Sequence, residues 1–220
     1  MSYHGLEQAL SLERFGTYLE WAEQNRDLAL QLYALNTAVS ESLYTPLQML
    51  EVALRNRVHS VLSARIAPDW YRLREVVGQR SAEDVRVVEG KLRYGRESVT
   101  SSDTVAALSL GFWTSLFGRH QEELWQVHLH GIAMREDGKG VTRKAFSRPL
   151  NDVRQLRNRV AHHEPIIARD LQGEYERILQ LTNWLSAPAA EWVSAHSRFP
   201  ESWIQRLAND CFRRGGRLAR

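Results

Sequence analysis

The sequence predicts an all-α protein, and three observations lead to that fold class. Apolar residues recur at intervals of three and four, as at Leu47, Leu50 and Leu54, which is the period of an amphipathic helix. No stretch alternates apolar and polar residues over a useful strand length. Breaking residues such as Pro68 and Gly78 fall where the periodic stretches end.

In the first part of the chain, the predicted helices cover residues 11–23, 27–44, 46–66, 69–77 and 81–94. Ser11, Asp27 and Ser81 come directly before or at the start of apolar stripes, so each can accept a hydrogen bond from the first turn as an N-cap. Pro46 should restart the helix at that point, and Pro68 should end the one that follows.

In the second part, the predicted helices cover residues 104–117, 119–132, 150–163, 171–185, 188–195 and 199–212. Residues 98–103 are predicted to be a polar connector, and residues 136–140 a turn-rich loop. The helix over 104–117 is nearly all apolar and should be interrupted at Gly111. We expect it to be buried, or else to form a face shared with another subunit.

Composition indicates one globular domain of ordinary polarity. The chain has 220 residues, of which 43% are hydrophobic and 25% charged, with a net charge of +3. We predict a loose lead-in over residues 1–10, one helical domain over 11–212 and a basic tail over 213–220. The segment 141–169 is locally basic, with seven Lys or Arg against two acidic residues. It is either a solvated face or an electrostatic path for RNA.

Several features point to a cytoplasmic protein without a metal or cofactor. Cys211 is the single cysteine, so no intrachain disulfide can form, and a reducing compartment is expected. The sequence has no apolar run long enough for a membrane span and no signal-peptide core. The histidines and Cys211 lack the spacing of metal ligands, so we expect neither a metal site nor a cofactor.

The segment 150–165, LNDVRQLRNRVAHHEP, carries the candidate chemistry. Its apolar residues recur at helical spacing, so one side should face a core. Asn158 and His162 then lie one turn apart on one face, and Arg157 lies at the edge of the apolar stripe. Pro165 should end the helix soon after. We therefore expect a polar cluster in the last turns of a helix, half sheltered by the core.

An imidazole beside a guanidinium suits work on a phosphodiester. His162 can take or give a proton near neutral pH, and Arg157 can bind phosphate oxygens with two parallel hydrogen bonds. A 2′-hydroxyl of RNA deprotonated by the imidazole could attack its own phosphate without a metal. The alternative is that the arginines form surface ion pairs and His162 caps the helix end, and spacing alone leaves both interpretations open.

A second polar line lies on the predicted helix over 46–66. Glu51, Arg55 and His59 are spaced by four and share one face beside the apolar stripe. Glu51 and Arg55 could form a helix-stabilising pair, or packing in a bundle could bring Arg55 and His59 near His162. The pentapeptide LRNRV occurs at 54–58 and again at 156–160, which convergence can explain.

These segments resemble a known family. Arg157-Asn158 followed by His162 matches the Arg–polar–x3–His pattern of HEPN-type ribonucleases, and LRNRVAHHEPI is similar to the signature of the bacterial Abi-like (abortive infection) proteins. The block YTPLQMLEVALRNRVH over 44–59 resembles the N-terminal block of the same family. The resemblance covers roughly residues 12–185. It implies a HEPN-like helical bundle with additional short helices and a metal-independent endoribonuclease that acts in phage defence or as a toxin.

The resemblance also implies roles and partners. His162 would transfer protons, Arg157 would hold the phosphate, and Asn158 would orient one of these groups. Members of the family build the site from two copies, so a homodimer acting on RNA is expected. Auxiliary RNA contacts are predicted for Arg154, Arg159, His163, Glu51, Arg55 and His59.

Two other functions stay open from the sequence. The first is a non-catalytic helical module that binds a structured regulatory RNA through its basic segments. The second is a scaffold that binds a protein partner through the apolar residues 108–117.

Overall fold

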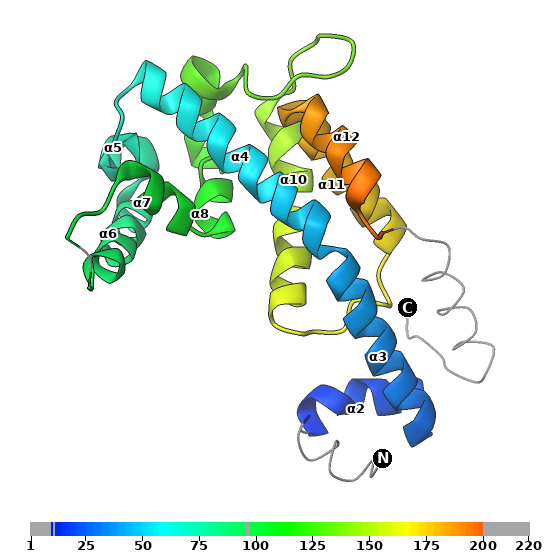
Figure 1. The fold of residues 1–220 in the computed structure, drawn as a ribbon. Helices are drawn as coiled ribbons and strands as arrows, with labels where there is room; N and C mark the ends of the chain where they lie inside the picture. Colours follow the sequence, from blue (N-terminus) through cyan, green and yellow to red (C-terminus); the bar gives the residue numbers. More distant parts are fainter. Residues whose placement is uncertain (1–9, 11, 96, 200–220) are drawn as a thin grey trace. The chain divides into compact units, whose positions relative to one another are not determined.

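The fold is all-α, as the sequence predicts. The structure, a computed structural model, describes residues 10, 12–95 and 97–199. Three predicted segments lie wholly or mostly outside these residues: the lead-in except Leu10, the helix over 199–212 except its first residue, and the tail over 213–220. Helices, turns and loops make up the described residues (Figure 1), and their one bridge of β type is an isolated pair between Met134 and Gly140. Within the same residues, every helix is too short or too polar to cross a membrane.

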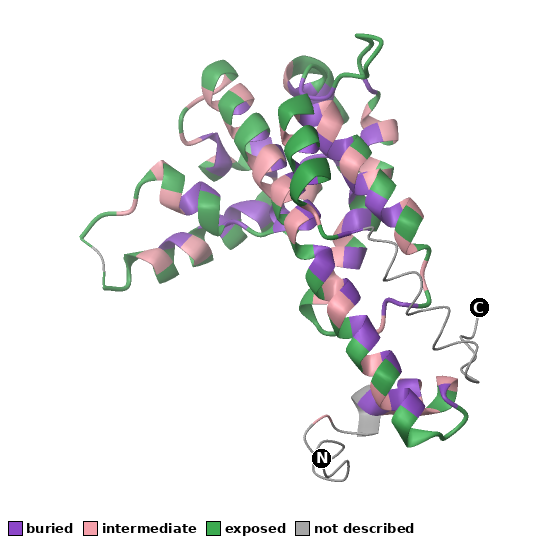
Figure 2. Cartoon of the chain, turned by 45° about the vertical axis from the view of Figure 1, so that its right-hand side comes forward, coloured by how far each residue is buried: buried purple, intermediate pink, exposed green. Residues whose placement is uncertain are grey.

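The described chain separates into two compact units, each of which combines segments that are distant in sequence. Of the described residues, the first unit contains those up to Pro46, Gln155–Glu176 and those from His196 onward, and the second contains those within Leu47–Arg154 and Arg177–Ala195. The single domain over 11–212 stays a prediction. Buried residues alternate with exposed ones along most helices (Figure 2), as expected for amphipathic helices that each pack one side inward.

The first unit is built on α2 (Leu12–Trp21) and α3 (Arg26–Ser42). Asn25 caps α3, since its side chain accepts from the Leu28 N–H at 3.1 Å. The predicted cap, Asp27, instead lies in the first turn, where a carboxylate favours the positive end of the helix dipole. Tyr18 is fully buried between the two helices, with its ring 5.4 Å from that of Tyr33.

The second unit begins at Leu47 within α4 (Tyr44–Arg65). This helix follows α3 after Leu43 and holds Pro46 in its first turn. Proline is tolerated there because the first helical N–H groups have no partner. After α4 come η1 (Trp70–Arg72), α5 (Arg74–Val77) and α6 (Gln79–Arg93). Gly78 separates α5 from α6 as predicted, with a positive φ of 80°.

Two predicted helix boundaries in this region are wrong. Ser81 is not the cap of α6, which begins at Gln79; the Ser81 hydroxyl lies 3.2 Å from that of Ser115. The predicted connector over 98–103 contains the start of α7 (Ser101–Ala107), because Thr100 and Asp103 form a capping box.

The apolar segment 104–117 is core, and its break differs from the prediction. Ser109 caps α8 (Leu110–Ser115), so the chain breaks before Gly111 rather than at it. Trp113 is fully buried and its ring contacts those of Phe112 and Trp70 at 5.2 and 6.0 Å. Burial of these aromatic rings bears out the core interpretation over an exposed docking face.

The next segment contains η2 (Arg119–Gln121), α9 (Glu122–Leu124) and the π-helix η3 (Trp125–Leu129). Two arginines of α4 bind carbonyl groups in and just after η3: Arg65 donates to the Val127 carbonyl at 3.0 Å, and Arg57 donates to the Gly131 carbonyl at 3.4 Å. Cationic side chains suit such positions because the last carbonyls of a helix lack partners within it. Arg57 of the first LRNRV copy therefore has a structural role.

The remaining helices are α10 (Arg143–Ala161), α11 (Leu171–Leu185) and α12 (Ala187–His196). The latter two agree with the prediction. Helix α10 begins earlier than the predicted Leu150, because Thr142 caps it by accepting from the Ala145 N–H at 3.2 Å. Pro149 lies inside α10 and removes one of its backbone hydrogen bonds.

Candidate active site

The last turns of α10 hold the candidate catalytic residues in the first unit. Leu156 is fully buried and fixes the orientation of the helix, which leaves Arg157 and Asn158 half-buried. His162 comes one turn after Asn158, and its N–H donates to the Asn158 carbonyl at 2.9 Å. His162 is exposed, so the expectation of a half-sheltered cluster is correct for Arg157 and Asn158 and wrong for the imidazole.

A Schellman motif, and not Pro165 alone, ends α10. The Glu164 N–H donates to the Arg159 carbonyl at 2.9 Å, and the His163 N–H donates to Val160 at 3.1 Å. His163 has a φ of 59°, in the left-handed region that usually holds glycine at this position. The two adjacent histidines therefore differ: His162 follows the helix directly, while His163 forms the reversal.

A buried asparagine of α3 fixes the chain that leaves this helix end. Asn36 is 4% exposed. Its Oδ1 accepts from the Ile166 N–H at 2.7 Å, and its Nδ2 donates to the Glu164 carbonyl at 3.3 Å. Ile166 itself is fully buried. Asn36 thus holds the segment directly after His162 and His163, and it is the positioning residue that the sequence analysis missed.

Two of the predicted auxiliary arginines have local partners. Arg159 lies 3.4 Å from the Glu164 carboxylate, and both side chains are largely exposed. Such an ion pair contributes little to stability, so phosphate could replace the carboxylate. Arg154 belongs to the second unit, where it donates to Asn151 Oδ1 at 2.9 and 3.3 Å.

The second polar line, Glu51, Arg55 and His59, lies on α4 in the second unit. His59 Nδ1 accepts from the indole N–H of the buried Trp70 at 3.1 Å. Indole only donates, so this imidazole is neutral and carries its proton on Nε2. Burial lowers the pKa of His59, in agreement with that state. These contacts give His59 a structural role, and Arg55 likewise points to a backbone carbonyl, that of Ala106 at 3.5 Å.

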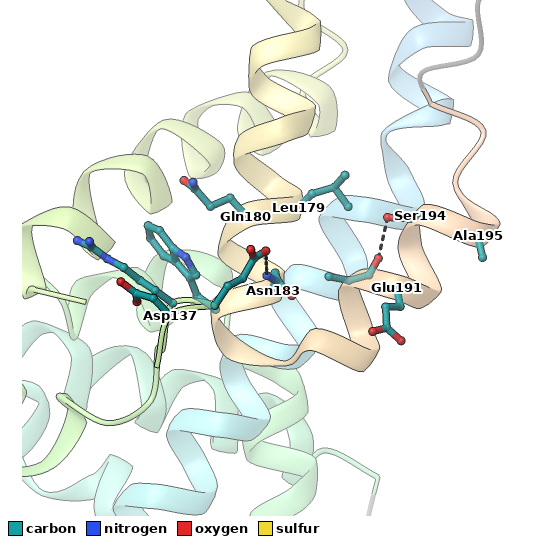
Figure 3. A pocket seen from close by; sticks show the side chains of 11 residues that line it. Asp137, Leu179, Gln180, Asn183, Glu191, Ser194 and Ala195 are labelled. Atoms are coloured by element: carbon teal, nitrogen blue, oxygen red, sulfur yellow. Dashed lines mark hydrogen bonds between the residues drawn. The ribbon is translucent and has the colours of Figure 1, made fainter. Parts of the chain in front are cut away.

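One hollow of the described chain contains none of the predicted residues. It measures about 1200 Å³ and lies in the second unit, among α11, α12 and the loop at 135–137 (Figure 3). Three of its side chains are carboxylates, those of Glu136, Asp137 and Glu191, and Asn183 donates to Glu136 at 3.2 Å. An acidic wall repels a phosphodiester, so size alone does not make this hollow the site.

Metal ligands do not gather anywhere in the described residues, where no group of three or more His, Cys, Asp or Glu side chains could hold an ion. Cys211 lies outside those residues. The end of α10 offers imidazole, guanidinium and amide groups.

Comparisons with protein-family models, curated proteins and solved structures found no match for this chain.

Proposed function

We propose that the protein is a metal-independent endoribonuclease whose catalytic groups lie at the end of α10. One observation carries the proposal: His162 is exposed one turn beyond Asn158, and Asn158 and the preceding Arg157 are half-buried in α10. An exposed imidazole can meet a polymer that a closed pocket would exclude. The Arg–polar–x3–His pattern resembles that of HEPN-type ribonucleases, which supports this reaction class.

In the proposed reaction, neutral His162 removes the proton of a 2′-hydroxyl, and that oxygen attacks the adjacent phosphorus. The O2′–P bond forms and the P–O5′ bond breaks, leaving a 2′,3′-cyclic phosphate and a 5′-hydroxyl end. A second proton must reach the departing O5′ oxygen. Arg157 stabilises the charge on the non-bridging oxygens, and Asn158 orients the imidazole or one of those oxygens.

The need for two proton transfers supports a site made from two copies of the chain. One imidazole can act as base while the imidazolium of the second copy acts as acid, as in a two-fold homodimer. The exposure of His162 suits such an arrangement, since a partner can approach it. By the same resemblance, we propose a role in phage defence or as a toxin.

The proposal is tested by RNA cleavage in excess chelator with wild type, His162→Ala and Arg157→Ala. His130→Ala is the matched control, because it removes an exposed imidazole that lies outside α10. We expect cleavage by wild type and by the control, and a loss of about 10²- to 10⁴-fold in His162→Ala. Full activity in His162→Ala, or activity that the chelator abolishes, would overturn the proposal. RNA that is bound but left uncut would favour a non-catalytic RNA-binding module.

A further inference from the structure

A second hollow lies wholly within the second unit and is strongly basic. It has a volume of about 860 Å³ and is bounded by α8, the turn at 117–119 and the first part of α10; we call it the α8–α10 groove. Both helices are labelled in Figure 1. Five basic side chains line it against one carboxylate, that of Asp152: Arg119, Arg143, Lys144, Arg148 and Arg154.

The basic residues of α10 follow one face of the helix. Lys144 and Arg148 are four apart, and Asn151 and Arg154 continue the same side. From Arg143 to Arg154 the helix rises about 17 Å. That length is enough for several successive phosphates of a nucleic-acid strand. The groove therefore suits a polyanion more than a single phosphate.

Some of the basic side chains of the groove are held by hydrogen bonds or ion pairs within the protein, and others are free to bind a ligand. Arg143 donates to the Phe117 carbonyl at 2.9 Å and pairs with Glu122, and Arg154 is held by Asn151. Lys144 and Arg148 are exposed, and among the described residues neither has a hydrogen bond or an ion pair. Two unpaired cations beside two oriented guanidinium groups make a surface that phosphate oxygens can enter without first breaking an ion pair.

The charge of this groove contrasts with that of the larger hollow in Figure 3, where carboxylates outnumber cations. Both belong to the same unit, so an approaching polyanion is attracted to one hollow and repelled by the other.

We infer that the α8–α10 groove binds the phosphodiester backbone of single-stranded RNA. The inference rests on the proposed function for the identity of the polymer, and it assigns the groove to substrate binding rather than to chemistry. Binding there is independent of sequence, since phosphate contacts carry no base information.

The test measures binding of a fluorescently labelled oligouridine at several salt concentrations. All proteins carry His162→Ala, so that the RNA stays intact. The groove variant adds Lys144→Gln and Arg148→Gln. Its matched control adds Arg86→Gln and Lys91→Gln on α6, which remove the same charge from exposed positions in the same unit. Thermal unfolding of each variant verifies that the fold is kept.

We expect the groove variant to bind more weakly and with a smaller dependence on salt. Each lost phosphate contact to a single strand lowers the slope of log K against log[salt] by about 0.7, so two lower it by about 1.4. Between 50 and 200 mM salt, the reference protein would thus lose roughly sevenfold more affinity than the groove variant. The control should retain the slope of the reference protein.

Each outcome separates the two proposals. If the groove and control variants have the same slope while wild type cuts RNA, the groove inference is overturned and the nuclease proposal stands. If the groove variant loses affinity and slope but wild type does not cut RNA, the groove inference stands and the nuclease proposal fails. Absence of any oligouridine binding by folded protein overturns the groove inference.

Discussion

Replacement of Asn36 by alanine should loosen the chain that leaves the candidate site. The change removes the acceptor of the buried Ile166 N–H at 2.7 Å and the donor to the Glu164 carbonyl at 3.3 Å. A buried donor left without a partner costs about 1–3 kcal/mol. Glu164 is exposed, so water can replace the second bond. We therefore expect the free energy of unfolding to fall by about 2–3 kcal/mol.

Chemical denaturation and hydrogen exchange test this estimate. A loss of that size should lower the melting temperature by roughly 4–12 °C for a chain of this length. The Ile166 amide should exchange roughly 30- to 140-fold faster, because each 1.4 kcal/mol is a factor of ten in its opening equilibrium. Thr37→Ala is the matched control, since Thr37 is exposed and its hydroxyl bonds only to Tyr33 of the same helix at 3.1 Å. If Asn36→Ala matches this control in stability and exchange, Asn36 does not hold the segment.

Three further substitutions test other contacts of the structure. His163→Gly should stabilise the protein by about 0.5–1 kcal/mol, because glycine adopts the positive φ of 59° without strain. Denaturant unfolding measures this change, and a loss of stability would contradict the Schellman assignment. The pKa of His59 is lowered in the folded state, so its contribution to stability is present above the unfolded value near 6.5 and is lost as pH falls through the folded value. His59→Asn keeps an acceptor for the Trp70 indole but has no titrating group. The melting temperature of this variant should therefore vary less with pH between about pH 5 and 7 than that of wild type, and an unchanged variation would refute this role of His59. Arg143→Met should lower the free energy of unfolding by about 1–2 kcal/mol, because it removes the donor to the carbonyl of the buried Phe117. Lys144→Met, at an exposed position, should change it by less than about 0.5 kcal/mol, and equal effects of the two changes would contradict the assignment.

Periodicity and breaking residues predicted most of the helices because both act locally. Pro46 and Gly78 lie at helix starts or breaks, as their backbone restrictions require. The boundary errors also had local signals. The Thr100-x-x-Asp103 capping box and the Ser109 cap are both readable in the sequence, and the Ser109 cap competes with the glycine signal at Gly111.

The candidate site was less predictable, because its surroundings come from distant segments. The interval from Asn158 to His162 places both on one face of α10, but interval alone does not give exposure, and His162 is exposed. Asn36 contacts Ile166 across 130 positions of the chain. Its one sequence signal is a polar residue four places after Leu32, within the apolar stripe of α3. Helical spacing likewise could not predict that Trp70 is the partner of His59, since Trp70 lies in the 3₁₀ turn that follows α4.

The central claim, attack by a 2′-hydroxyl with His162 as base, is tested most directly by removing that hydroxyl. Two labelled RNAs that differ only by a deoxyribose at the cut nucleotide are incubated with wild type in chelator. We predict that the ribose substrate is cut to a 2′,3′-cyclic phosphate and that the deoxy substrate stays intact at that bond. Cleavage of both substrates at equal rates would contradict the account.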